Sequence, residues 1–303
     1  MSARWCVHPL LALVLAPLLV GVVNRTKALV AGRRGQPLLQ PYHDLWKLLR
    51  KGAVYSRTTT WVFRASPVVG LAAVLVALAM VPLGGLPALI SFPGDLVLFA
   101  YLLGLMRFFM VIAALDTGSS FEGMGASREV QFSALAEPAL LLGLAAVARQ
   151  TGSLSLSAMY SAISVDLWRA AGPGLALVAA ALGVVFLAEN ARIPVDDPNT
   201  HLELTMIHEV MVLDHSGPDF AFILYTAALK LWVLGALLTG IVIPFRSGSV
   251  WFDAAVGVAC MLGLAAVVGV IESSMARLRL IRVPQLLVGA GALAALAIIL
   301  GLR

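Results

Sequence analysis

The amino-acid sequence predicts an all-α membrane protein that crosses the bilayer about eight times. Hydrophobic residues make up 60% of its 303 residues and charged residues only 12%, whereas soluble domains carry about 25% charged residues. The apolar residues form runs of about 20, the length that a helix needs to cross a hydrocarbon core of about 30 Å. Nearly all the charge lies in the short segments between these runs. Transmembrane helices explain this pattern.

The first apolar run, residues 5–23, is longer than a signal peptide requires, lacks a convincing small-residue cleavage site and is followed by basic residues. We therefore expect it to be retained as a span. Seven further runs follow, and the segments between them are too short for a separate domain. We predict one membrane domain over residues 1–303, with spans near residues 5–23, 66–83, 95–115, 132–148, 173–190, 219–244, 252–272 and 284–302.

Between the first two spans, residues 42–51 predict an amphipathic helix at the membrane surface. Such a helix carries large apolar residues on one side and basic residues at the interface. The apolar side would carry Leu45, Trp46, Leu48 and Leu49, and the interface Lys47, Arg50 and Lys51.

The charged residues also predict the orientation of the chain. Fourteen lysines and arginines fall in one set of alternating loops, five in the other set and two inside spans. The positive-inside rule then places the basic loops in the cytoplasm and both termini outside a bacterial inner membrane. Thirteen of the sixteen carboxylates lie on the basic side, which suggests a docking surface, an ion entrance or both. Loop topology explains the net charge of +5, and we expect no nucleic-acid binding.

Segment 116–137 is rich in glycine up to Ser127, which could cap a helix that continues into the fourth span. Glu137 would then lie about 15 Å along that helix. A carboxylate at such depth costs about 2.5–3.5 kcal/mol, so it should face protein or water. Glu137 is therefore either part of an ion path or an interfacial residue that precedes Pro138.

Segment 189–219 predicts a further helix of about fourteen residues. Thr200 and Glu203 have the spacing of a capping box, and Ser216-Gly217-Pro218 supplies a stop. Apolar residues surround most of this helix, so it should be packed within protein, and Glu203 and Glu209 would need partners or water.

Three histidines in this segment recur every seven residues, at positions 201, 208 and 215. Their axial spacing of about 10 Å is too long for one metal ion, so core packing or protonatable relay positions are favoured. Of the charges at 107, 230 and 272, Lys230 lies deepest in its span and is the strongest candidate for an interior network.

No catalytic motif or metal-ligand spacing is present. The two cysteines, Cys6 and Cys260, lie in separate apolar runs, and no phosphate loop, dinucleotide fingerprint or metalloprotease helix occurs. We expect no catalytic residue, no metal and no cofactor in this chain.

Several motifs together resemble the subunit 1 family of respiratory complex I. They are R-R-G-Q-P-L-L-Q-P-Y-H-D-L-W-K from Arg33, L-D-T-G-S from Leu115, G-A-S-R-E from Gly125, E-P-A-L-L-L-G-L from Glu137 and A-E-N-A-R-I-P-V-D-D-P from Ala188. Within the family, the chain is most similar to the membrane subunit of formate hydrogenlyase and hydrogenase-4-type complexes. Residues 34–37, R-G-Q-P, depart from the longer R-x-G-P-N pattern of the quinone-binding branch.

The resemblance implies a non-catalytic subunit that anchors a redox arm and couples electron transfer to proton or sodium translocation. Its expected partners are hydrogenase-like large and small subunits, an iron–sulfur subunit and antiporter-like membrane subunits, and the nickel–iron centre and iron–sulfur clusters would belong to them. We assign docking and loop order to Arg25, Arg33, Arg34, Arg128 and Arg192, and ion coupling to Glu129, Glu137, Glu189, Asp196, Glu203, Glu209 and Lys230.

Two alternatives stay open. The first is the quinone-site subunit of a respiratory NADH dehydrogenase, which requires a lipophilic cavity between spans. The second is a stand-alone secondary transporter, against which the absence of an inverted repeat argues.

Overall fold

The computed structural model describes residues 4–196 and 206–301, and every regular element in those ranges is helical. Eight of the helices are long and apolar enough to cross a membrane, as the sequence predicts. They are α1 (Arg4–Val30), α3 (Trp61–Met80), α4 (Asp95–Asp116), α5 (Ser120–Thr151), α7 (Val165–Glu189), α8 (Gly217–Val242), α9 (Val250–Ser274) and α10 (Val283–Leu300). Two shorter helices are α2 (Gln40–Leu49) and α6 (Leu156–Ala162), and two 3-10 turns are Glu209–Val212 and Leu280–Arg282.

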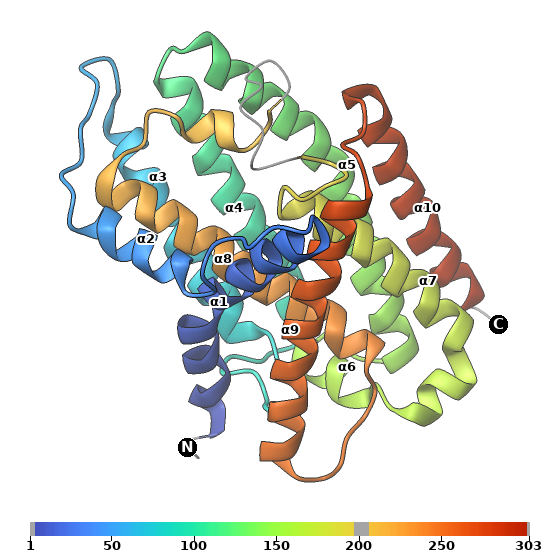
Figure 1. The fold of residues 1–303 in the computed structure, drawn as a ribbon. Helices are drawn as coiled ribbons and strands as arrows, with labels where there is room; N and C mark the ends of the chain where they lie inside the picture. The colour runs from blue at the N-terminus through green and yellow to red at the C-terminus, as the bar shows by residue number, and fades with distance from the viewer. Residues whose placement is uncertain (1–3, 197–205, 302–303) are drawn as a thin grey trace.

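The loops divide between the two ends of the bundle (Figure 1). One end, called here the basic end, comprises residues 31–60, 117–119, 190–196, 206–216 and 275–282. The opposite end comprises residues 81–94, 152–164 and 243–249, with α6 among them. Because eight spans alternate in direction, α1 begins and α10 ends at the opposite end. The amphipathic helix expected at 42–51 is confirmed as α2, which packs against α8 and α1 at the basic end.

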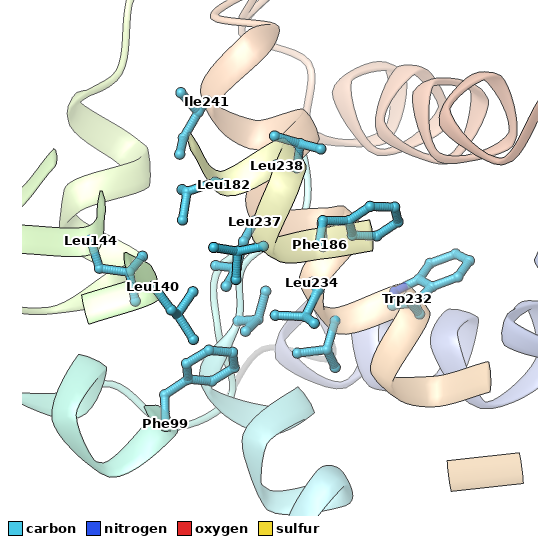
Figure 2. Close-up of a cluster of buried hydrophobic side chains, with 14 of the residues drawn as sticks. Phe99, Leu140, Leu144, Leu182, Phe186, Trp232, Leu234, Leu237, Leu238 and Ile241 are labelled. Carbon is cyan, nitrogen blue, oxygen red and sulfur yellow. The ribbon is translucent and has the colours of Figure 1, made fainter. Parts of the chain in front are cut away.

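The central helix of the bundle is α8, which contacts α1, α2, α3, α7 and α9. In its most apolar stretch 78% of the residues are buried, against at most 50% in any other span. Figure 2 shows side chains of α8 meeting those of α4, α5 and α7 in one apolar cluster. The labelled members are Phe99, Leu140, Leu144, Leu182, Phe186, Trp232, Leu234, Leu237, Leu238 and Ile241.

Several helices extend beyond the predicted spans, because apolar runs mark only the part of a helix that needs lipid. Helix α5 begins at Ser120, twelve residues before the expected span, and Ser127 lies inside it rather than at its cap. With 32 residues it is about 48 Å long, well beyond a bilayer core of about 30 Å. Helix α1 continues to Val30, α3 begins at Trp61 and α7 at Val165.

The helix of about fourteen residues predicted after Thr200 is also wrong over its described part. Residues 206–213 contain only the 3-10 turn Glu209–Val212. The cause is a side chain: the Asp196 carboxylate accepts the backbone N–H groups of Ile207 at 3.2 Å and His208 at 3.1 Å. These bonds fold the segment back onto residue 196 and occupy two backbone N–H groups that a helix would otherwise use. Glu203 and His201 lie outside the described residues.

Candidate functional site

Five charged side chains from four helices meet inside the bundle and form what we call the central charge cluster. Arg107 of α4 donates from Nε to Glu129 Oε1 at 3.0 Å, from Nη1 to Glu137 and from Nη2 to Glu189 at 2.5 Å. Lys230 Nζ of α8 lies 3.6 Å from Glu189 Oε2, which also accepts from Arg107 Nη2 at 2.5 Å. Glu129 and Glu137 belong to α5 and Glu189 to α7. One guanidinium thus joins carboxylates of two helices.

The cluster is an arrangement of buried charge. Arg107, Glu189 and Lys230 are 7%, 7% and 5% exposed, and burying an unpaired ion would cost several kcal/mol each. Pairing explains why these residues can lie among apolar helices. Three carboxylates nevertheless face two cations, so the fully ionised cluster carries one excess negative charge. Such a group can accept a proton or attract a cation without any further side chain.

The cluster also extends to the outer surface of the chain. The Glu137 side chain is 46% exposed although its carboxylate is bound to Arg107. Glu137 stands near the middle of α5, where the surroundings of a single chain would be lipid. The residue therefore links the interior charges to a lateral face of the bundle.

Asp196 and His208 continue the polar region toward the basic end. Asp196 Oδ1 pairs with Arg277 at 3.0 Å, while Oδ2 accepts the two backbone N–H groups described above. Burial lowers the pKa of His208, and the positive charges of Lys230 and Arg107 lower it further, against the opposing effect of Glu129 and Asp196. His208 is therefore neutral at pH 7 and can either donate or accept a hydrogen bond.

A cavity of about 430 Å³ lies beside the cluster, between α1, α8 and residues 189–196 and 208–215. Apolar side chains such as Leu213, Phe220 and Leu224 line much of it, whereas Glu189, Arg192, Asp196, His208, Glu209, His215 and Lys230 supply polar groups. Apolar walls with a few convergent polar groups are typical of small-molecule sites.

His215 borders this cavity and stacks on Phe63, with ring centroids 3.9 Å apart. Neither ring nitrogen has a hydrogen-bond partner in the part of the chain that the structure describes. Burial lowers the pKa of His215 to about 4.

The expected docking arginines divide into two groups. Arg33 and Arg34 are exposed at the basic end, and Arg25 donates to the backbone oxygen of Arg34. Arg128 instead donates to the Met206 oxygen at 2.9 Å, and Arg192 is buried and pairs with Glu272 at 3.3 Å. The first group lies on the surface. In the second group, Arg128 holds Met206 against α5 and Arg192 is itself joined to α9.

The residue that joins the cluster is absent from the predicted coupling network. Arg107 lies inside a predicted span, and a cation in such a place implies a carboxylate partner. Glu272 likewise pairs with Lys27 at 2.8 Å and with Arg192, linking α1, α9 and residue 192. Of the seven coupling candidates, the structure brings together Glu129, Glu137, Glu189 and Lys230, and places Asp196 and Glu209 near them along the cavity. Within 4–196 and 206–301, no three histidine, cysteine or carboxylate residues gather as a metal site would require.

Comparison with known proteins identifies the family of this chain. Residues 5–302 match the family model described as NADH dehydrogenase. The chain is 32% identical to formate hydrogenlyase subunit 4 of Escherichia coli (strain K12) over 287 residues, which cover 92% of both chains. It is also 32% identical to hydrogenase-4 component C of the same strain, over 77% of this chain and 72% of that protein.

More distant similarity extends to respiratory enzymes. A subunit of the NADH-quinone oxidoreductase of Anaplasma phagocytophilum (strain HZ) is 28% identical over 71% of this chain and 69% of that protein. The fold is similar to a chain of the membrane-bound sulfane sulfur reductase, an archaeal respiratory membrane complex, with a TM-score of 0.83, 20% identity and 98% coverage of both chains.

Proposed function

The chain belongs to the NADH dehydrogenase family, as a membrane subunit like subunit 1 of complex I, and we propose that it anchors a hydrogenase-like redox arm and couples it to ion movement. In this proposal the basic end faces the cytoplasm of a bacterium, where Arg25, Arg33 and Arg34 dock the arm. Arg128 and Arg192 order the segment beneath that arm. The nickel–iron centre and iron–sulfur clusters belong to the hydrogenase-like large and small subunits and an iron–sulfur subunit.

The central charge cluster carries this proposal. Its one excess negative charge is neutralised when a proton binds to one of the three carboxylates. Reduction of a neighbouring redox centre would favour proton uptake, and reoxidation would favour release. Asp196, Glu209 and His208 belong to the basic end and line the same cavity as Glu189 and Lys230 of the cluster, so they provide groups through which a proton can enter.

Glu137 provides the connection to the next subunit. Its carboxylate is bound to Arg107 on the inner side, yet nearly half of its side chain is exposed. An antiporter-like membrane subunit that covers this face would receive the proton or sodium path from Glu137. The same subunit would shield the carboxylate from lipid.

The test is ion translocation by the assembled complex in sealed vesicles. A Glu137→Gln variant keeps the shape of the side chain but removes its charge, and we expect assembly with at least tenfold slower ion movement. Asp166→Asn is the matched control, because Asp166 is exposed at the opposite end and pairs only with Arg169 in the described chain. Full ion movement by Glu137→Gln would refute the assignment, and transport by the purified single chain in liposomes would favour the stand-alone transporter.

One observation favours a second candidate, the quinone-site subunit of a respiratory dehydrogenase. The cavity of about 430 Å³ between α1, α8 and residues 189–196 and 208–215 is lined largely by apolar side chains and lies beside the cluster. The test is inhibition of the purified complex by quinone analogues. Competitive inhibition that Phe220→Trp weakens would support this candidate, whereas a complex that contains nickel and ignores the analogues would support the hydrogenase-like one.

A further inference from the structure

A band of positive charge and aromatic rings runs along the surface from α2 to the first turn of α3. Its cations are Lys47, Arg50, Lys51, Arg57 and Arg64, and all five are exposed. Trp46 and Trp61 are 64% and 72% exposed within the same stretch. We call these seven residues the cationic–aromatic band. It takes no part in the central charge cluster or in the cavity.

The charge of the band is not balanced by the protein. Residues 45–64 contain no carboxylate, and none of the five cations forms an ion pair with a carboxylate of the described chain. The nearest carboxylates in the sequence accept hydrogen bonds from uncharged groups. Asp44 accepts from Gln40 at 2.8 Å, and Asp116 accepts from the Thr60 backbone at 2.6 Å. The five cations of the band are therefore left without an ion-pair partner among the described residues.

The geometry of α2 directs the band away from the protein. The partly buried residues Tyr42, Leu45 and Leu48 recur every three positions and form the side that packs toward the bundle. Trp46, Lys47 and Arg50 lie on other sides of the same two turns and are exposed. Such separation of sides, with tryptophan and basic residues together, is the pattern of a helix that lies in the membrane interface.

The aromatic rings hold two of the guanidinium groups in place. Arg50 lies 5.9 Å from the centre of the Trp46 ring and Arg64 lies 4.3 Å from that of Tyr55. A cation over a ring keeps its N–H donors directed outward for an anionic ligand. Arg57 and Arg64 flank Trp61, the first residue of the apolar helix α3, so a membrane crossed by α3 would bring both cations near its headgroups.

We propose that the cationic–aromatic band binds the phosphate-bearing headgroups of anionic phospholipids such as phosphatidylglycerol. Basic residues near a membrane surface gain about 1 kcal/mol each from anionic lipid. Exposed tryptophan rings beside these cations are typical of a membrane interface. On the surface of a soluble protein the same rings would remain in water. This binding goes beyond the docking and coupling roles, and it holds α2 and the start of α3 at a fixed depth.

The experiment uses the assembled complex in phosphatidylcholine vesicles that contain a small fraction of spin-labelled phosphatidylglycerol, and measures the relative association constant from the immobilised fraction. The test variant is Arg50→Gln with Arg64→Gln. The control is Arg279→Gln with Arg282→Gln, which removes the same charge at exposed positions of the same end. We expect at least a fivefold loss of association for the test variant and less than a twofold loss for the control.

Two further measurements separate the explanations. A variant with Arg50→Lys and Arg64→Lys retains the charge and should retain most of the phosphatidylglycerol binding, so a loss as large as that of the glutamine variant would overturn the proposal. Spin-labelled phosphatidylcholine should show no preference in any variant. Equal losses in test and control would also overturn the proposal. The proposal would also be overturned if the test variant kept its lipid association but lost a soluble subunit. That result would identify the band as a protein contact.

Discussion

Lys230 of α8 and Glu189 of α7 lie 3.6 Å apart between Nζ and Oε2 and are both buried, so they form an interhelical ion pair inside the bundle. Glu189 is shared with Arg107 of α4. One carboxylate thereby connects three helices. The predictions below follow from this connection and from the groups around it.

Replacing Lys230 with methionine should destabilise the complex. The change leaves three carboxylates with one cation, and breaking a buried ion pair costs about 3–5 kcal/mol. Thermal unfolding of the purified complex should show a lower midpoint. Arg169→Met, which removes an exposed cation from a surface pair with Asp166 at the opposite end, is the control and should change the midpoint far less, because exposed pairs contribute about 0–1 kcal/mol. The double variant Lys230→Met with Glu189→Gln should recover part of the loss, and no recovery would contradict the pairing.

Arg107→Lys should retain assembly but slow ion movement by about tenfold or more. An ammonium group is a point charge and cannot reproduce a guanidinium fork that reaches three carboxylates. The initial rate of ion uptake into sealed vesicles is the measurement. Arg169→Lys, in an exposed pair with Asp166 at the opposite end, should behave as the parent protein. An unimpaired Arg107→Lys variant would show that the three contacts do not matter for coupling.

Acid should weaken the fold through His215. Burial lowers its pKa to about 4 from an ordinary value of about 6.5, so the unfolded chain binds a proton in a pH range where the folded chain does not. This contribution to stability is complete above pH 6.5, falls between about pH 6.5 and 4, and changes no further below pH 4. Unfolding midpoints of the complex at pH 7.5 and 5 provide the measurement.

His215→Phe is the matching variant for this acid effect, since a phenyl ring can keep the stack on Phe63 without titrating. Its midpoint should fall less than that of the parent protein between the two pH values. An identical fall in both proteins would assign the acid sensitivity to other groups.

Asp196→Asn should loosen segment 206–216. The carboxylate pairs with Arg277 and accepts two backbone N–H groups, and a neutral amide loses the ion pair and weakens both bonds. Hydrogen exchange at the amides of residues 207 and 208 should become at least tenfold faster. Asp214→Asn, at an exposed position of the same segment, serves as the comparison, and equal exchange in the two variants would remove Asp196 from this role.

The sequence alone predicts the parts of this fold that depend on the solvent. Apolar runs locate all eight spans, because only apolar helices whose backbone groups are all hydrogen-bonded can cross lipid. The pattern of residues 42–51 likewise locates α2. The sequence also singles out the charged residues at positions 107, 230 and 272, because they interrupt apolar runs. These features need no knowledge of which helices touch.

The partners of the buried charges and the backbone turns depend on tertiary contacts, so the sequence alone does not predict them. Arg107 pairs with residues 22, 30 and 82 positions away, which no local spacing reveals. The capping pattern of Thr200 and Glu203 predicts a helix, but Asp196 withdraws the N–H groups of Ile207 and His208 from it. The local preference for a helix is overridden here because a carboxylate outside the predicted helix accepts the same N–H groups.

The exposed flank of Glu137 bears on how the protein is made. Under the proposed function, a newly inserted copy that has not met its neighbour presents the half-exposed Glu137 side chain to acyl chains, a state that favours degradation over persistence. Synthesis of this chain would then have to be matched to that of the proposed subunit covering α5. In that proposal, one half-covered side chain is a reason to make the two subunits in equal amounts.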